Sequence, residues 1–158
     1  GLGDYCINIT YLENRKPTLG LIYSPITHTV WYAIKGKGSF KKVKNQKAES
    51  ISVREIPPVA TTITSKKGHQ LTSELVDKYN IKNELVVASA IKFCYIAEGK
   101  ADYYFRHRNK ACDWDIASGD LIVTEAGGEV IILDCPNYTY GVSPFLAPSL
   151  MVKGKSKH

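Results

Sequence analysis

The chain has 158 residues, 44% of them hydrophobic, which is enough for the core of one domain or somewhat more. No apolar run reaches the length of a membrane span, and the first residues lack the basic start of a signal peptide. The net charge of +6 is moderate, and no base-stacking aromatic pattern accompanies the lysines. A nucleic-acid-binding domain is therefore the weakest interpretation, and a salt-dependent DNA titration would test it.

The four cysteines (Cys6, Cys94, Cys112 and Cys135) are spaced too widely for a zinc site or a redox motif. Three of them fall in apolar segments, where cysteine is usually a small core residue. We therefore expect a reduced, cytoplasmic protein. The chain lacks an initiator methionine and starts in a strand pattern, so we also expect it to be a piece of a longer protein.

Residues 5–12, 18–23 and 29–34 have the composition of strands and are separated by polar turns, which predicts an antiparallel meander. A lysine-rich loop is expected to follow, and then a short apolar segment at 51–53. The loop lysines are interpreted as a solvated surface that would favour a small phosphorylated substrate over nucleic acid. They are Lys35, Lys37, Lys41, Lys42, Lys44 and Lys47.

Pro57-Pro58 predicts a boundary that divides the chain into domains at residues 1–56 and 57–158. Beyond it the pattern alternates between strands and helices, which is typical of a mixed or parallel sheet covered by helices. The expected strands are 60–64, 85–88, 103–105 and 130–133, and the expected helices are 71–79, 89–98 and 115–126.

The most informative stretch is Asp113-Trp114-Asp115-Ile116-Ala117-Ser118-Gly119, followed by Glu125-Ala126-Gly127-Gly128. Asp115 stands where a helix N-cap belongs. Its carboxylate can accept from the first free N–H groups, or it can point outward and hold a cation. The small residues after it would allow the helix to pack closely, and the glycine pair would end it.

This stretch resembles the C-terminal signature of the inositol monophosphatase superfamily, W-D-x-A-x-G followed by E-A-G-G. The resemblance implies that Asp115 binds a catalytic Mg²⁺ ion. It also implies an α+β, inositol-phosphatase-like sandwich in truncated form. In that form, the last antiparallel strands of a metal-binding domain precede a complete mixed α/β domain on the substrate side.

Three other segments are similar to the 3′(2′),5′-bisphosphate nucleotidase branch of that family. Gly3–Ile9 resembles G-E-F-x-V-N-I, Gly20–Pro25 resembles G-V-V-Y-A-P, and Ser89–Cys94 resembles G-S-S-L-K-F-C. The resemblance implies removal of one phosphate from adenosine 3′,5′-bisphosphate, dependence on Mg²⁺ and inhibition by Li⁺. The partner would be a small phosphorylated nucleotide.

A substrate with two phosphates needs cations beyond the metal. Lys92 and either Arg106 or Arg108 are candidates for these contacts. The predicted helix start at Ser89 would also offer free backbone N–H groups to a phosphate or ribose. Asp115 adds the metal ligand beside them. The alternatives stay open: Asp115 as a helix cap only, Lys92 as a solvated helix residue, and one of the two arginines as a surface residue.

Three neighbouring residues receive no functional role. The serine and lysine run before His69 is one residue longer than in the branch, so His69 is assigned to the surface. Trp114 is assigned to packing, and Asp113 has no assigned role.

The family's reaction also needs a Glu-Glu pair and a D-P-x-D-G-T motif, and neither occurs in this sequence. One carboxylate cannot hold a metal cluster, because Mg²⁺ requires several oxygen ligands. We therefore expect the C-terminal portion of a magnesium-dependent phosphatase that is inactive alone. The alternatives are a catalytically dead remnant that binds a nucleotide or a partner chain, and an inositol monophosphatase. The strands at 5–34 would expose one apolar face and associate through it.

Overall fold

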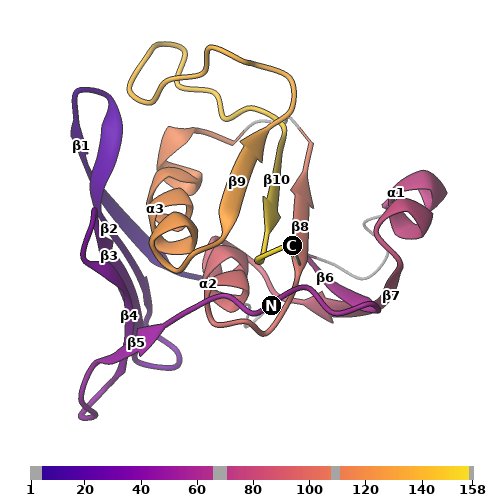
Figure 1. The fold of residues 1–158 in the computed structure, drawn as a ribbon. Helices are drawn as coiled ribbons and strands as arrows, with labels where there is room; N and C mark the ends of the chain where they lie inside the picture. The colour runs from indigo at the N-terminus through magenta and orange to yellow at the C-terminus, as the bar shows by residue number, and fades with distance from the viewer. Residues whose placement is uncertain (1–4, 66–70, 108–110, 157–158) are drawn as a thin grey trace.

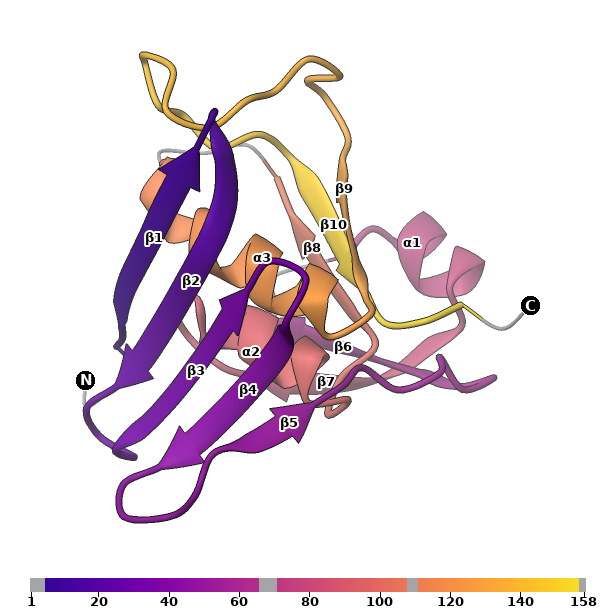
Figure 2. The ribbon, with the colours of Figure 1, turned by 60° about the vertical axis from the view of Figure 1, so that its left-hand side comes forward.

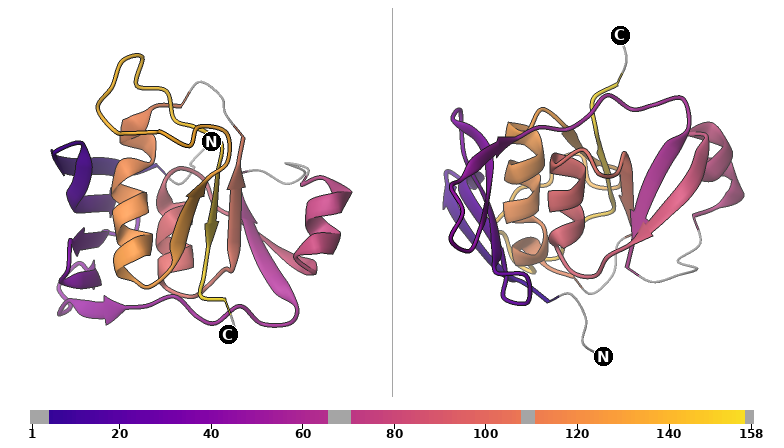
Figure 3. Two further views of the ribbon diagram at one scale, coloured as in Figure 1. Left: turned by 45° about the horizontal axis from the view of Figure 1, so that its top comes forward. Right: turned by 90° about the horizontal axis from the view of Figure 1, so that it is seen from below.

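The computed structural model describes residues 5–65, 71–107 and 111–156. Within these residues, two five-stranded sheets enclose a middle layer made by α2 (Ile91–Ala97) and α3 (Ala117–Glu125). Helix α1 (Ser73–Lys78) lies on the far side of the second sheet (Figures 1 and 3). None of the helices in these ranges has the length and apolar character needed to cross a bilayer.

The first sheet is the predicted antiparallel meander, with its strands in chain order from β1 to β5 (Figure 2). The expected lysine-rich loop is wrong, because its first half forms β4. Lys41 in this strand turns toward the helices and reaches Glu98, so the charged pattern conceals a strand. The strands are β1 (Ile7–Glu13), β2 (Lys16–Ser24), β3 (Thr29–Ile34), β4 (Gly38–Val43) and β5 (Glu49–Ile51).

The second sheet is mixed, as expected, in the order β7-β6-β8-β10-β9. Strand β6 runs parallel to both β7 and β8, and β10 is antiparallel to β8 and β9. Strand β7 begins four residues earlier than the predicted 85–88, and β10 was not predicted. The strands are β6 (Ala60–Thr64), β7 (Ile81–Val86), β8 (Tyr103–Arg106), β9 (Glu129–Ile132) and β10 (Leu150–Lys153). The α+β class is confirmed, and the domain boundary stays a prediction.

One apolar core runs through the middle layer and joins the two sheets. Ile22 and Trp31 of the first sheet, Phe93 of α2, Ile122 of α3 and Leu150 of the second sheet are all buried in it. A second, smaller cluster lies under α1 on the other face of the second sheet. The middle helices are therefore apolar on most sides, as expected for helices covered on both faces.

Helix α3 fits between its neighbours because its first turn carries small side chains. A Cβ atom on Gly119 would lie 2.7 Å from Cδ2 of Phe93, and one on Gly20 of β2 would lie 3.0 Å from the carbonyl oxygen of Ser118. Both separations are tighter than ordinary van der Waals contact. The sequence of small residues after Asp115 therefore sets how closely α2, α3 and β2 approach.

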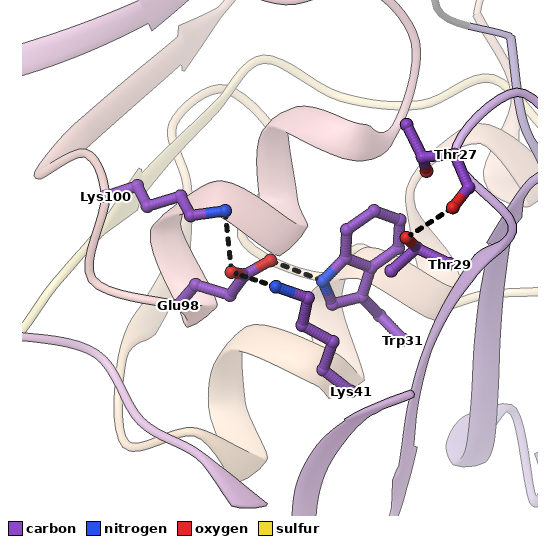
Figure 4. Close-up of polar contacts among 6 residues, drawn as sticks. All are labelled: Thr27, Thr29, Trp31, Lys41, Glu98 and Lys100. Atoms are coloured by element: carbon purple, nitrogen blue, oxygen red, sulfur yellow. Dashed lines mark hydrogen bonds and ion pairs between the residues drawn. The ribbon is translucent and has the colours of Figure 1, made fainter. Parts of the chain in front are cut away.

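Glu98 at the end of α2 fastens this layer to the first sheet (Figure 4). Its Oε1 accepts from Trp31 Nε1 at 2.5 Å, and its Oε2 accepts from Lys41 and Lys100 at 2.9 and 2.7 Å. Burial alone would raise the pKa of Glu98, but the hydrogen bonds from Lys100, Lys41 and Trp31 outweigh burial and lower it. The carboxylate is therefore held in its charged form.

Two other carboxylates connect distant segments. Glu125, at the end of α3, accepts from the backbone N–H groups of Gly36 and Gly38 at 2.9 and 3.0 Å, so it closes the β3–β4 turn. Asp102 is fully buried, and its two carboxylate oxygens accept from Arg54 Nε and Nη2, each at 2.8 Å. One of these oxygens also accepts from the backbone N–H of Thr61. These contacts fix the chain that leads from the first sheet into the second.

Replacing Gly119 with alanine is expected to destabilise the fold by about 1–3 kcal/mol, because the added methyl group collides with Phe93. Urea unfolding of the purified chain measures this change. Combining Gly119→Ala with Phe93→Leu should recover part of the loss, since the smaller side chain removes the collision. A Gly119→Ala chain as stable as the parent would show that α2 and α3 can move apart freely.

Glu98→Gln is expected to lower the free energy of unfolding at pH 7 by about 1–3 kcal/mol, because its three donors lose a charged acceptor. The folded-state pKa is lowered, so this stabilisation is complete above the unfolded-state value of roughly 4.3 and disappears as the pH falls through the folded-state pKa. Urea unfolding at pH 7 and at acid pH should show the difference between parent and variant shrinking. Glu129 provides the control, because it pairs with Lys153 at an exposed position. Glu129→Gln should therefore have little effect on stability at either pH.

Candidate functional site

A pocket of about 440 Å³ opens where the first sheet, α2 and the second sheet meet. This volume is in the range of small-molecule sites. Its walls combine hydroxyl, amide, cationic and carboxylate side chains with aromatic ones. The polar side chains that line it are Asn8, Thr62, Thr64, Ser65, Ser89, Lys92, Tyr104, Arg106, His107 and Asp115.

The topology of the second sheet explains the position of the pocket. Strands β6 and β8 are parallel, so Thr64 and Arg106 lie at the same edge, where both strands end. Ligands of α/β units gather at such edges. Asn8 of β1 brings the first sheet to this edge, and its Nδ2 donates to the Trp114 carbonyl at 3.2 Å.

Asp115 lies in the pocket wall but is not the N-cap of α3, so that expectation is wrong. It is the last residue of a 3₁₀ turn (Asp113–Asp115), and α3 begins two residues later. Its Oδ2 accepts from the backbone N–H of Cys112 at 2.9 Å, as the far member of a capping box. This bond fixes the side chain and uses one of its two oxygens.

Lys92 is not the solvated helix residue that was one of the two interpretations. It is 4% exposed, and its Nζ donates to the Ser89 carbonyl at 2.6 Å and lies 5.2 Å from the centre of the Tyr104 ring. Lysine is seldom buried so fully without a specific reason. The Ser89 carbonyl and the face of the Tyr104 ring therefore help to hold the ammonium group at the pocket.

Ser89 lies before α2 and does not begin it, contrary to expectation. Its backbone has a φ of 62°, in the left-handed region, and α2 starts at Ile91. Its hydroxyl lies 2.7 Å from Cys6 Sγ, and Cys6 in turn donates to Asn8 at 3.1 Å. Ser89 thus connects the pocket to β1 and does not offer the N–H groups of a helix start.

Arg106 and Tyr104 complete the charged wall. Burial raises the pKa of the Tyr104 phenol, Arg106 opposes this rise by its charge and a hydrogen bond, and Asp115 adds to it. Ser89, Lys92, Arg106 and Asp115 all line this one pocket, so the structure brings the four predicted residues together. Arg108 and His69 lie outside the described residues.

Five polar residues of the pocket were missed by sequence reasoning: Asn8, Thr62, Thr64, Ser65 and His107. Thr64, Ser65 and His107 share one signal, a polar side chain at or just after the end of a strand, which becomes specific only once the parallel pairing of β6 and β8 is known. Asn8 lies near the start of β1 and Thr62 in the middle of β6, so only the folded arrangement places them in the pocket.

The donor set of the described residues does not by itself fit a metal cluster. No group of three or more His, Cys, Asp or Glu side chains in residues 5–65, 71–107 and 111–156 is arranged to hold a metal ion. Asp115 is the carboxylate that lines the pocket in these ranges, and one of its oxygens already accepts from Cys112. A hard divalent cation needs more oxygen ligands than this.

Asp113 has a clear structural role, although none was assigned from the sequence. It is 6% exposed, and it accepts from the Tyr138 hydroxyl and from Gly141 N, both at 2.6 Å. Burial and then the bond to Asp113 raise the pKa of the Tyr138 phenol. The loop after β9 is thereby fastened to the turn that carries Asp115.

Comparison with known proteins gives a consistent result. The model of the inositol monophosphatase family matches residues 1–157. The 3′(2′),5′-bisphosphate nucleotidase CysQ of Salmonella typhimurium is 30% identical over 128 residues, which are 81% of this chain and 51% of that protein. The Nus factor SuhB of Haemophilus influenzae is 30% identical over 165 residues, covering 97% of this chain and 59% of the relative.

Solved structures match as well. CysQ from Bacteroides thetaiotaomicron superposes with a TM-score of 0.75 at 25% identity, covering 98% of this chain and 64% of that one. The Pyrococcus horikoshii protein PH1897, described as similar to inositol-1 monophosphatase, gives a TM-score of 0.77 at 26% identity, with 98% and 59% covered. This chain thus spans between half and two thirds of the length of these relatives.

Asp113→Ala is expected to cost about 2–4 kcal/mol of stability, because Tyr138 and Gly141 lose a buried charged acceptor. The loss should be largest around the loop after β9, so hydrogen exchange of amides in residues 134–146 should accelerate more than exchange in β2. Asp134→Ala is the matched control, since Asp134 accepts from Ser149 N at an exposed position of the same loop. Equal acceleration across the whole chain would contradict a local anchoring role.

Proposed function

Because the chain belongs to the inositol monophosphatase family, a family of metal-dependent phosphatases, we propose that it forms the substrate-binding part of a 3′(2′),5′-bisphosphate nucleotidase. The substrate would be adenosine 3′,5′-bisphosphate or a similar small nucleotide, and the products AMP and phosphate. The observation that carries this proposal is the buried ammonium of Lys92 in one pocket with Arg106.

Two cations in one pocket suit a ligand with two phosphates. A guanidinium group can bind a phosphate through two parallel hydrogen bonds, and an ammonium group acts as a compact point charge. The Lys92 ammonium carries three donor hydrogens and donates to the Ser89 carbonyl at the pocket wall. A single phosphate on a neutral sugar ring would need fewer cations, so the site favours the nucleotide over inositol monophosphate.

The metal of the complete enzyme would be Mg²⁺, with Asp115 as one of its ligands. Since the described residues do not complete such a site, the other oxygen ligands would come from polypeptide outside them. We therefore propose that this chain alone binds nucleotide without hydrolysing it at a useful rate. The same observation favours a second candidate, a catalytically inactive nucleotide-binding protein.

The free cysteines in the described part of the chain agree with a cytoplasmic location.

The purified chain is expected to bind adenosine 3′,5′-bisphosphate in calorimetric titration, and Lys92→Met should weaken this binding at least tenfold, because one charge-assisted contact is lost. Lys82→Met removes an exposed lysine from β7 and should leave binding unchanged. Phosphate release from the same nucleotide should be absent with and without Mg²⁺.

Two outcomes would refute the proposal. Equal binding of the nucleotide by the parent and the Lys92→Met chain would show that Lys92 does not contact it. Robust Mg²⁺-dependent turnover that disappears in Asp115→Asn would show that the chain builds its own metal site, and the assignment to a substrate-side part would be wrong.

A further inference from the structure

A continuous chain of hydrogen bonds runs along one wall of the pocket. The thiol of Cys6, just before β1, donates to Oδ1 of Asn8 at 3.1 Å and lies 2.7 Å from the Ser89 hydroxyl. Nδ2 of Asn8 donates to the Trp114 carbonyl at 3.2 Å. Cys6 is partly buried and packs against the main core. These bonds therefore join the segment before α2 to the turn that carries Asp115.

The Trp114 carbonyl fixes the direction of every bond in this chain. A carbonyl oxygen can only accept, so Asn8 must turn its Nδ2 toward Trp114 and its Oδ1 toward Cys6. Since Oδ1 also only accepts, the single S–H hydrogen of Cys6 is committed to Asn8. The sulfur then serves as the acceptor for the Ser89 hydroxyl. Cys6 is thus both donor and acceptor, and a side chain without both capacities would break the chain of bonds.

Ser89 depends on contacts with other segments to keep its conformation. Its φ of 62° lies in the left-handed region, which a serine seldom adopts unless its surroundings hold it there. The carbonyl of the same residue accepts from Lys92 Nζ at 2.6 Å. Because the backbone conformation of Ser89 decides where this carbonyl points, the bond between the Ser89 hydroxyl and Cys6 also affects the position of the Lys92 ammonium group.

We propose that Cys6 is a positioning residue that sets the place of the Lys92 ammonium group in the pocket. Asn8, Ser89 and Lys92 line the pocket, and Cys6 contacts the first two of them. The thiol thereby ties the wall that carries Lys92 to the turn that carries Asp115. Resting on the proposed function, the phosphate that Lys92 binds is then held at a fixed distance from the Asp115 carboxylate, as a reaction at that phosphate requires.

The first measurement reports on Lys92 without any nucleotide. The full chain, kept reduced, is acetylated briefly with acetic anhydride, and mass spectrometry compares labelling of Lys92 with that of the exposed Lys82. Cys6→Ala should raise the relative labelling of Lys92 about threefold to tenfold, the range expected for one lost neutral hydrogen bond. Cys6→Ser keeps a donor and an acceptor at this position, so it should return the labelling to the parent value.

The second measurement is calorimetric titration with adenosine 3′,5′-bisphosphate. Cys6→Ala should weaken binding about threefold to tenfold in the parent chain. It should have no further effect in the Lys92→Met chain, because Cys6 acts through Lys92, whereas a merely structural loss would add in both backgrounds. Cys135→Ala is the matched control, since Cys135 is a partly buried thiol in the loop after β9 and should alter neither measurement.

Ser89→Ala removes the other end of the same bond and replaces Cys6→Ala if circular dichroism shows that the latter does not fold. It should raise Lys92 labelling to the same extent. Three results would overturn the proposal: labelling that stays at the parent value in these variants, a Cys6→Ser chain that does not restore it, or an additive effect with Lys92→Met. If the parent chain binds no nucleotide, the proposed function fails, while the labelling still decides the role of Cys6.

Discussion

The close approach of α3 to its neighbours is the constraint on which the rest of the structure depends. Gly119 lies against the Phe93 ring, and Ser118 lies against Gly20, so α2, α3 and the first sheet are locked at one separation. Because the other side of this layer packs on the second sheet, the same separation sets the distance between the two sheets. The pocket lies at one end of that space, so its width follows from glycines that never touch a ligand.

Buried carboxylates fix this arrangement at its margins. Glu98 attaches α2 to the first sheet, Asp102 holds Arg54 in the connection between the sheets, and Asp113 fastens the loop after β9. Each has lost water and regained hydrogen bonds from several donors, which is the condition under which a buried charge is tolerated. They specify where loops run, whereas the apolar core supplies most of the driving force.

Local pattern predicted the fold well wherever it was strong. Alternation and turn residues identified β2 and β3, and the strand at 60–64 was placed correctly. Strand β4 was missed because the charge of Lys41 is compensated by Glu98, 57 residues away, and no local pattern contains that partner. The prediction that Asp115 caps α3 was wrong for a similar reason. Its carboxylate accepts from the backbone N–H of Cys112 and so closes the turn before the helix, not the helix itself.

The pocket residues also divide into those that local motifs identified and those whose position depends on distant strand pairing. Ser89, Lys92, Arg106 and Asp115 were found because they belong to short motifs that resemble a known family. Asn8 and Thr64 were missed because their place in the pocket depends on which strands pair and in which direction. Sequence motifs therefore identified Ser89 and the three charged residues, and topology was needed to identify Asn8 and Thr64.

Glu125 has a consequence for how the protein is made. Its carboxylate closes a turn at Gly36 and Gly38, 89 and 87 residues earlier in the chain. On a ribosome, the first sheet would emerge long before α3 is available to cover it. During that interval both of its faces are exposed to water, including the one that is buried in the finished fold. Nascent chains with such delayed long-range contacts are prone to aggregate, so synthesis of this protein should depend on chaperones that bind apolar strands.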